Sequence, residues 1–198
     1  MGDKKGFIYN ILNYPLIFIF LRSLLDGGQV KYLKNIIEKY QIESILDIGC
    51  GCGSFSRIAT GRYVGIDYNP KFISYSSKKY SNSNKSFFVM DARTMELSEL
   101  FDAIILINTI HHFSDGEVIT IIRSAKKYSK RYIIIHDLVP QRNPISWFFY
   151  YIDRGSYIRT IEQQKDLVIR SGLEIKEVFY KRTPPGIYLH STLICKVN

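Results

Sequence analysis

The sequence predicts an α/β fold in which helices cover a mainly parallel β-sheet. Two observations support this fold class. Stretches with helical periodicity alternate with short runs of β-branched and aromatic residues along the chain. The run Tyr132–His136 is largely apolar, as expected of a strand buried on both faces of a parallel sheet. The 198 residues contain no repeat or interdomain linker, so we expect a single domain over 1–198.

The expected elements alternate along the chain as such a sheet requires. Helices are expected over 8–25, 30–40, 115–128 and 160–171. Strands are expected near 44–48, 63–67, 86–90, 102–107, 131–136, 174–181 and 188–197. The helix start at Thr160 is marked by a capping box with Gln163. The last two strands are expected to form a closing hairpin.

A glycine-rich turn after the first strand is the most informative segment. Asp47 lies inside the strand end, and Gly49, Gly51 and Gly53 follow at alternate positions before an expected helix. Glycine lets the main chain approach a ligand closely, so we expect exposed N–H groups in this turn. The dinucleotide fingerprint G-x-G-x-x-G fails in both frames, because serine stands where the third glycine is required. A tight turn without a ligand is the alternative.

Acidic residues also end the next two strands. Asp67 follows Asp47 by about twenty residues, the offset at which α/β nucleoside sites place a ribose-binding carboxylate. Asp91 ends the strand after that. Alternatively, Asp67 caps a helix that begins near Pro70, and Asp91 caps one over 93–100. The recurrence of acids at successive strand ends favours ligand binding.

These segments, with Asn108–Phe113 after the fourth strand, resemble the motifs of class I S-adenosylmethionine (SAM) dependent methyltransferases of the small-molecule type, over roughly residues 40 to 140. The resemblance implies a Rossmann-like three-layer sandwich with a seven-stranded, mostly parallel sheet and an antiparallel last strand. It implies SAM as cofactor, whose sulfonium and ammonium suit acidic neighbours. The implied contacts are Asp67 with the ribose and Asp91 and Ala92 with adenine. The cofactor-binding residues implied are Asp47, Gly49, Cys50, Gly51, Gly53, Asp67, Tyr68, Asp91, Ala92 and Asn108.

The segment after the fourth strand also holds the candidate catalytic residue. The resemblance places it beside the transferred methyl group, so His111 is the first candidate for a base that deprotonates the acceptor. The other candidates are His112, and His136 acting with Asp137 at the end of the fifth strand. Each histidine could instead cap a helix or pack as a neutral ring.

Two aromatic segments are expected to flank the site. The N-terminal helical region 7–40 is expected to cap the cofactor cleft, with Tyr9 and Tyr14 as candidate contacts. Its apolar run is too short to span a bilayer, and peripheral contact with a membrane surface is left open. Residues 140–159 include five consecutive aromatics and predict a lid-like insert beside the substrate, with an ordinary packed helix as the alternative.

Composition narrows the class of function. The net charge of +9 suggests acidic partners, but the basic residues are scattered in pairs along expected helices. The three cysteines form no zinc-binding pattern, so no metal is expected, and their usage suggests a reducing, cytoplasmic location. We therefore expect a SAM-dependent methyltransferase (EC 2.1.1 class) acting on a small apolar or aromatic metabolite.

Two alternative functions are left open. Methylation of RNA, DNA or protein would suit the positive charge, but residues 108–113 lack the prolines of the Asn/Asp-Pro-Pro-aromatic motif of nucleic-acid amino-methyltransferases. Nucleic acid is therefore a disfavoured partner. A SAM-binding protein without catalytic activity would keep the same fold. The sequence determines neither the acceptor atom nor the oligomeric state.

Overall fold

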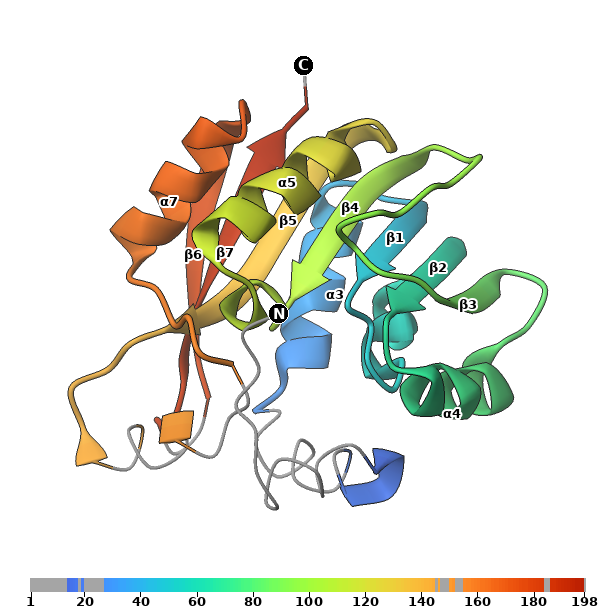
Figure 1. Cartoon of the computed structure of the whole chain (residues 1–198), viewed down its shortest axis with the longest axis horizontal. Helices are drawn as coiled ribbons and strands as arrows, with labels where there is room; N and C mark the ends of the chain where they lie inside the picture. Colours follow the sequence, from blue (N-terminus) through green and yellow to red (C-terminus); the bar gives the residue numbers. More distant parts are fainter. Residues whose placement is uncertain are drawn as a thin grey trace.

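The structure is a computed structural model that describes residues 14–17, 19, 27–144, 146, 150–151, 155–183 and 186–197. Within these residues, a seven-stranded sheet has the order β3-β2-β1-β4-β5-β7-β6 (Figure 1). The strands are β1 (Ser44–Ile48), β2 (Arg62–Asp67), β3 (Lys85–Val89), β4 (Phe101–Ile107), β5 (Ser129–Val139), β6 (Glu174–Arg182) and β7 (Leu189–Lys196). The helices are α3 (Gln29–Lys39), α4 (Pro70–Tyr80), α5 (Asp115–Lys126) and α7 (Ile161–Arg170), with 3-10 helices η1 (Ser54–Ile58) and η2 (Ile110–His112).

The pairing of the strands confirms the predicted fold class. β1 pairs in parallel with β2 and β4, and the parallel pairing continues to β3 on one side and to β5 on the other. β7 is antiparallel to both of its neighbours, β5 and β6. Because the chain runs outward from β1 in one direction and then from β4 in the other, a switch point lies between these two strands. Ligands of open α/β sheets bind at the carboxyl ends of the strands at such a point.

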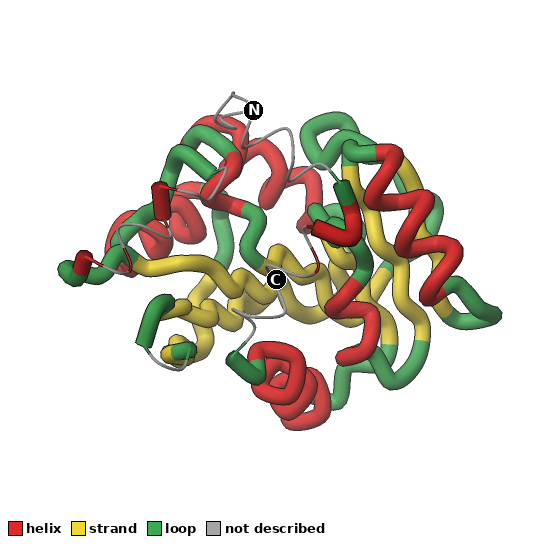
Figure 2. The backbone as a smooth tube through the Cα atoms, turned by 90° about the horizontal axis from the view of Figure 1, so that it is seen from below, coloured by secondary structure: helices red, strands yellow, loops and turns green. Residues whose placement is uncertain are grey.

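Helices cover both faces of the sheet, which forms the middle layer (Figure 2). α5 and α7 lie on one face, and α3, α4 and η1 pack on the other. Side chains along β4 point alternately to the two faces of the sheet. Leu106 packs in the same core as Ile122 of α5, whereas Ile105 packs with Leu33 of α3. All four side chains are buried, so β4 is apolar throughout, as a central parallel strand must be.

Local signals explain where the helices begin. The capping box predicted at Thr160 is present, with its Oγ1 accepting from the N–H of Gln163. Asn69 caps α4 through the N–H of Lys71, and proline occupies the first helical position. The alternative in which Asp67 caps α4 is therefore wrong, because Asp67 accepts from the N–H of Asn69 instead.

Several expected elements differ in the structure. The helix expected after the glycine turn is a 3-10 helix of five residues, η1. The helix considered over 93–100 is absent, and Asp91 closes a short turn there by accepting from the N–H of Arg93. β5 extends to Val139, beyond its expected end. Of the predicted cap 7–40, the segment that includes Tyr9 lies outside the described residues, as do residues 147–149 of the aromatic insert.

No helix in the described part of the chain is both long and apolar enough to cross a membrane. Within the predicted cap, the ring centroid of Tyr14 lies 4.7 Å from the Nζ of Lys71 on α4. Tyr14 itself is 56% exposed. Its predicted contact with a cofactor stays a prediction.

Candidate cofactor and active site

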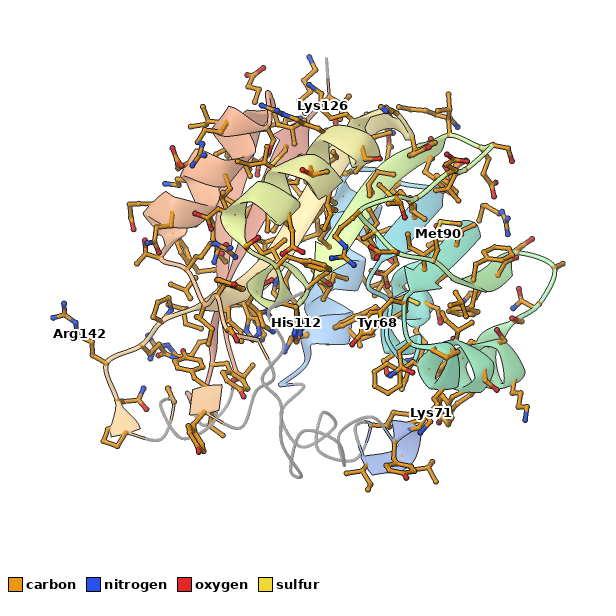
Figure 3. The ribbon with its side chains drawn as sticks, viewed as in Figure 1. Tyr68, Lys71, Met90, His112, Lys126 and Arg142 are labelled. Carbon is orange, nitrogen blue, oxygen red and sulfur yellow. The ribbon has the colours of Figure 1, made fainter. Side chains whose placement is uncertain are left out.

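A small cavity opens where the parallel strands end. Tyr68 and Met90, which follow β2 and β3 and lie on its wall, are labelled in Figure 3. Its lining is Gly49, Ile66, Asp67, Tyr68, Met90, Asp91, Ala92, Arg93, Thr109 and Phe113. Half of the predicted cofactor residues belong to it: Gly49, Asp67, Tyr68, Asp91 and Ala92. The other half lie outside its lining: Asp47, Cys50, Gly51, Gly53 and Asn108.

The glycine turn has a backbone that only glycine adopts readily. Gly49, Gly51 and Gly53 have φ of 76°, 53° and 73°. A Cβ added at Gly49 would lie 2.7 Å from Cγ2 of Thr109, which packs against the turn from the end of β4. The glycines therefore allow β1 and β4 to approach closely at the switch point.

The N–H groups of this turn were expected to be exposed, but they donate hydrogen bonds within the protein. Those of Gly49 and Cys50 donate to the carbonyl of Ile66, at 2.8 and 3.0 Å. That of Gly51 donates to Oδ2 of Asp67, at 2.9 Å. The expectation is wrong for these three groups because the parallel neighbour β2 supplies acceptors at its own carboxyl end. These hydrogen bonds join the turn to β2, and the side chain of Asp67 accepts one of them.

The first two strand-end acids have different surroundings. Asp67 lines the cavity, and its two oxygens accept from the N–H groups of Gly51 and Asn69. Asp47 is buried beneath the turn, where its Oδ2 accepts from the Tyr63 hydroxyl at 2.5 Å. Burial, with the negative charge of Asp47, raises the pKa of Tyr63 well above its usual value. Asp47 thus joins β1 to β2 inside the protein, while Asp67 forms part of the cavity wall.

Asp91 forms an ion pair at the cavity wall. The Nε of Arg93 donates to Oδ1 of Asp91 at 2.9 Å, and Nη2 donates to Oδ2 at 2.5 Å. Nη1 of Arg93 donates to Oε1 of Glu117 at 3.1 Å. The hydrogen bonds from Arg93 lower the pKa of the Asp91 carboxyl. Arg93 was not among the predicted site residues, since one arginine in a turn gives no signal in the sequence.

Asn108 lies between the end of β4 and the start of α3. Its backbone is left-handed, with φ of 50°, and its N–H donates to the carbonyl of His136 at 2.7 Å. Its side-chain Nδ2 donates to Oε1 of Gln29, the first residue of α3, at 3.1 Å. Gln29 is buried and was not predicted. This contact brings the start of α3 to the end of β4.

His111 and Asp137 form a buried pair. Nδ1 of His111 lies 2.5 Å from Oδ1 of Asp137, and the side chains are 3% and 1% exposed. The other oxygen, Oδ2, accepts from the N–H groups of Thr109 and Ile110 at 3.0 and 2.7 Å. Burial alone would raise the pKa of Asp137, but the charge and hydrogen bond of His111, with a hydrogen bond from the N–H of Leu138, lower it overall.

The prediction that Asp137 acts with His136 is wrong, because consecutive residues of a strand point to opposite faces. His136 points to the α3 face, where Nδ1 lies 2.8 Å from Oγ1 of Thr192. Its ring stacks on that of His190, with centroids 4.8 Å apart. The hydroxyl of Tyr32 from α3 also meets Thr192, at 3.0 Å. This polar cluster joins strands β5 and β7 to α3.

His112 is the more exposed histidine of the turn. Its ring centroid lies 4.3 Å from that of His111, with the planes tilted by 38°. Figure 3 shows His112 at the same edge of the sheet as Tyr68. The turn η2 therefore presents a half-buried imidazole at the strand ends and holds a second one inside.

The end of the aromatic insert packs onto this turn. The N–H of Tyr157 donates to the carbonyl of His111 at 3.0 Å. Arg159 is buried and donates to the carbonyls of Ile110 and Phe113, at 2.9 and 2.7 Å. A Cβ added at Gly155 would overlap the His111 ring. The described part of the insert thus contacts the segment that carries the candidate base.

Cys50, Cys52 and Cys195 are buried free thiols. Burial, together with the charges of Asp47 and Asp67, raises the pKa of Cys50 well above its usual value. Among the described residues, no group of three or more His, Cys, Asp or Glu side chains is placed to hold a metal ion.

Comparison with known proteins bears on this architecture. Residues 45–131 match the family described as "Methyltransferase domain". They run from β1 into β5 and include both the cavity and His111. This part of the chain is therefore similar to methyltransferase domains. The resemblance stated from the sequence motifs is confirmed.

Two curated relatives match part of this chain. It is 28% identical over 110 residues to Malonyl-[acyl-carrier protein] O-methyltransferase of Acetivibrio thermocellus, covering 50% of this chain and 39% of that protein. It is 24% identical over 108 residues to (S)-coclaurine N-methyltransferase of Thalictrum flavum subsp. glaucum, covering 49% and 30%. The matched region thus spans less than half the length of either relative.

A solved structure shares the fold over more of the chain. Magnesium protoporphyrin IX methyltransferase of Synechocystis PCC 6803 with bound S-adenosylhomocysteine (SAH) has a TM-score of 0.69 at 17% identity, covering 87% of this chain and 84% of that one. The same enzyme with bound SAM gives a TM-score of 0.68, with coverage of 87% and 80%. The likeness shows a common fold, one that holds SAM and SAH in those structures.

Proposed function

We propose that the protein is a SAM-dependent methyltransferase whose acceptor is a small apolar or aromatic metabolite. The observation that carries the proposal is the placement of two carboxylates, Asp67 and Asp91, on one cavity at the ends of β2 and β3. The match of residues 45–131 to methyltransferase domains supports it, and so do relatives named as O- and N-methyltransferases.

The residues around the cavity suit the groups of SAM. Asp67 would accept from ribose hydroxyls, and Asp91 with the N–H of Ala92 would contact adenine. When bound, SAM supplies an electrophilic methyl group on a sulfonium, so the protein must chiefly orient the acceptor and exclude water. Asn108, Gly51 and Gly53 remain proposed contacts on the other side of the glycine turn.

His111 is the proposed base for an acceptor that must lose a proton. Asp137 fixes the orientation of the imidazole through Nδ1, so Nε2 is the nitrogen proposed for proton transfer. A carboxylate that remains ionised would also stabilise the imidazolium formed in that step. The described end of the aromatic insert packs on the same turn, and we propose that the insert supplies the apolar surface for the acceptor.

Calorimetry with SAH tests the cofactor site. Replacing Asp67 by Ala should weaken binding by about tenfold or more, because it removes an acceptor of the ribose hydroxyls and the tie to the glycine turn. Asp166→Ala is the matched control, since Asp166 lies exposed on α7 in an ion pair with Arg170. Unchanged affinity in the folded Asp67→Ala protein would reject the assignment.

The acceptor class is tested by transfer of a labelled methyl group from SAM to panels of small phenols, amines and acids, and to RNA. RNA binding that weakens steeply with salt, together with labelled RNA, would favour the nucleic-acid alternative. SAH binding without transfer to any acceptor would favour a SAM-binding protein without catalytic activity. Transfer of the label to a small molecule, lost when His111 is replaced, would support the proposed reaction.

A further inference from the structure

The cavity wall contains a guanidinium group that the proposed cofactor contacts do not use. Arg93 lines the cavity together with Asp91 and Ala92. Its Nε and Nη2 donate to both oxygens of Asp91, while Nη1 is held by Glu117 of α5. The side chains of Arg93 and Asp91 are 38% and 35% exposed. The pair is therefore fixed from α5 and still accessible to a ligand in the cavity.

Glu117 holds the guanidinium in place because it is itself anchored. Its Oε2 accepts from the N–H and the hydroxyl of Ser114, at 3.0 and 2.8 Å, in the capping box of α5. Its Oε1 is the atom that accepts from Arg93. The orientation of Arg93 at the cavity thus follows from the start of α5, and its planar fork is preorganised beside Asp91.

The chemistry of this wall matches two kinds of purine edge. The Asp91 carboxylate with the N–H of Ala92 suits a 6-aminopurine, whose amino group donates and whose N1 accepts. The same carboxylate beside the Arg93 guanidinium suits a 6-oxopurine, whose N1–H donates and whose O6 accepts. With a carboxylate alone, O6 would meet an acceptor and be repelled.

We propose that Arg93 determines the base specificity of this site, and that its guanidinium lets the cavity bind 6-oxopurine nucleosides as well as 6-aminopurine nucleosides. The inference rests on the proposed function, because it places the purine of SAM in this cavity. Without Arg93, the site would select strongly for the amino group.

Calorimetric titration with SAH and with its 6-oxo counterpart, S-inosylhomocysteine, tests this inference. The wild type should bind both, with dissociation constants within about tenfold of each other. In Arg93→Met, binding of the 6-oxo compound should fall by about tenfold more than binding of SAH, because a charge-assisted donor is lost. Arg93→Lys keeps the charge and should retain part of the 6-oxo binding.

Arg62→Met is the matched control. Arg62 forms a comparable pair with Glu99, with side chains 35% and 43% exposed, and it is not part of the cavity lining. Its ratio of the two dissociation constants should equal that of the wild type. An unchanged ratio in Arg93→Met, with SAH still bound, would overturn this inference alone. Failure of the wild type to bind either nucleoside would overturn the proposed function and this inference with it.

Discussion

The carboxylate of Asp137, on β5, lies 2.5 Å from Nδ1 of His111, in the turn that follows β4. It also accepts from the N–H groups of Thr109 and Ile110, so one buried side chain holds both the imidazole and the backbone of the turn. The turn borders the cavity through Thr109 and Phe113. The conformation of this turn, and with it the site, depends on a contact between β5 and the segment that follows β4.

Asp137→Asn is therefore expected to destabilise the protein by about 3 kcal/mol, because an amide cannot accept from all of these donors. Urea denaturation followed by circular dichroism measures the change. Asp166→Asn, in an exposed pair on α7, should stay within about 0.5 kcal/mol of the wild type. A loss below about 1 kcal/mol for Asp137→Asn, roughly that of a single ordinary hydrogen bond, would contradict this explanation.

Gly155→Ala is expected to displace the His111 ring, because the new methyl group would overlap Cδ2 and lie 2.9 Å from the carbonyl oxygen of His111. We expect a loss of about 1 to 3 kcal/mol in unfolding free energy, with shifted imidazole resonances in NMR spectra. Gly116→Ala on α5 is the control, since nothing lies within 4 Å of its added Cβ. That variant should be neutral or slightly stabilised. Equal behaviour of the two variants would argue against close packing at Gly155.

Tyr63→Phe is expected to cost about 1 to 3 kcal/mol, because it removes a donor to the buried carboxylate of Asp47. The variant keeps the ring, so the loss reports on the hydrogen bond rather than on a cavity. Tyr180→Phe, at a 54% exposed position on β6, should leave the unfolding free energy unchanged. If both variants are equally stable, the contact contributes nothing to holding β1 and β2 together.

The pH dependence of stability should include a contribution from Glu117. Burial alone would raise its pKa, but hydrogen bonds from Ser114 and Arg93 lower it from 4.5 to about 2. Because the folded-state pKa is the lower one, this contribution is complete above pH 4.5 and is lost as the pH falls toward 2. Thermal unfolding of Glu117→Gln and the wild type should therefore differ at neutral pH, and the difference should shrink over that range. A difference between the two proteins that stays constant with pH would contradict the lowered pKa of Glu117.

Much of the architecture followed from local patterns. The strands of the parallel sheet were predicted to within a few residues because central strands must be apolar on both faces, as β4 is. Helix starts were marked by chemistry that acts over three residues, as at Thr160. The turn after Asp91 has no such signal. A helix over 93–100 was one alternative there, and the structure instead shows the side chain of Arg93 hydrogen-bonded back to Asp91.

The sequence by itself determined the alternation of strands and helices, the three left-handed glycines and the acids at the strand ends, because each depends on residues close together in the chain. Only the tertiary structure decided which partner each polar group takes. Asp137 contacts His111 rather than His136. Asp67 accepts a hydrogen bond from the N–H group of Gly51, which was expected to be exposed. These pairings join residues on different strands, so they depend on the register of the sheet and on which face each side chain points to, and neither is encoded in local spacing.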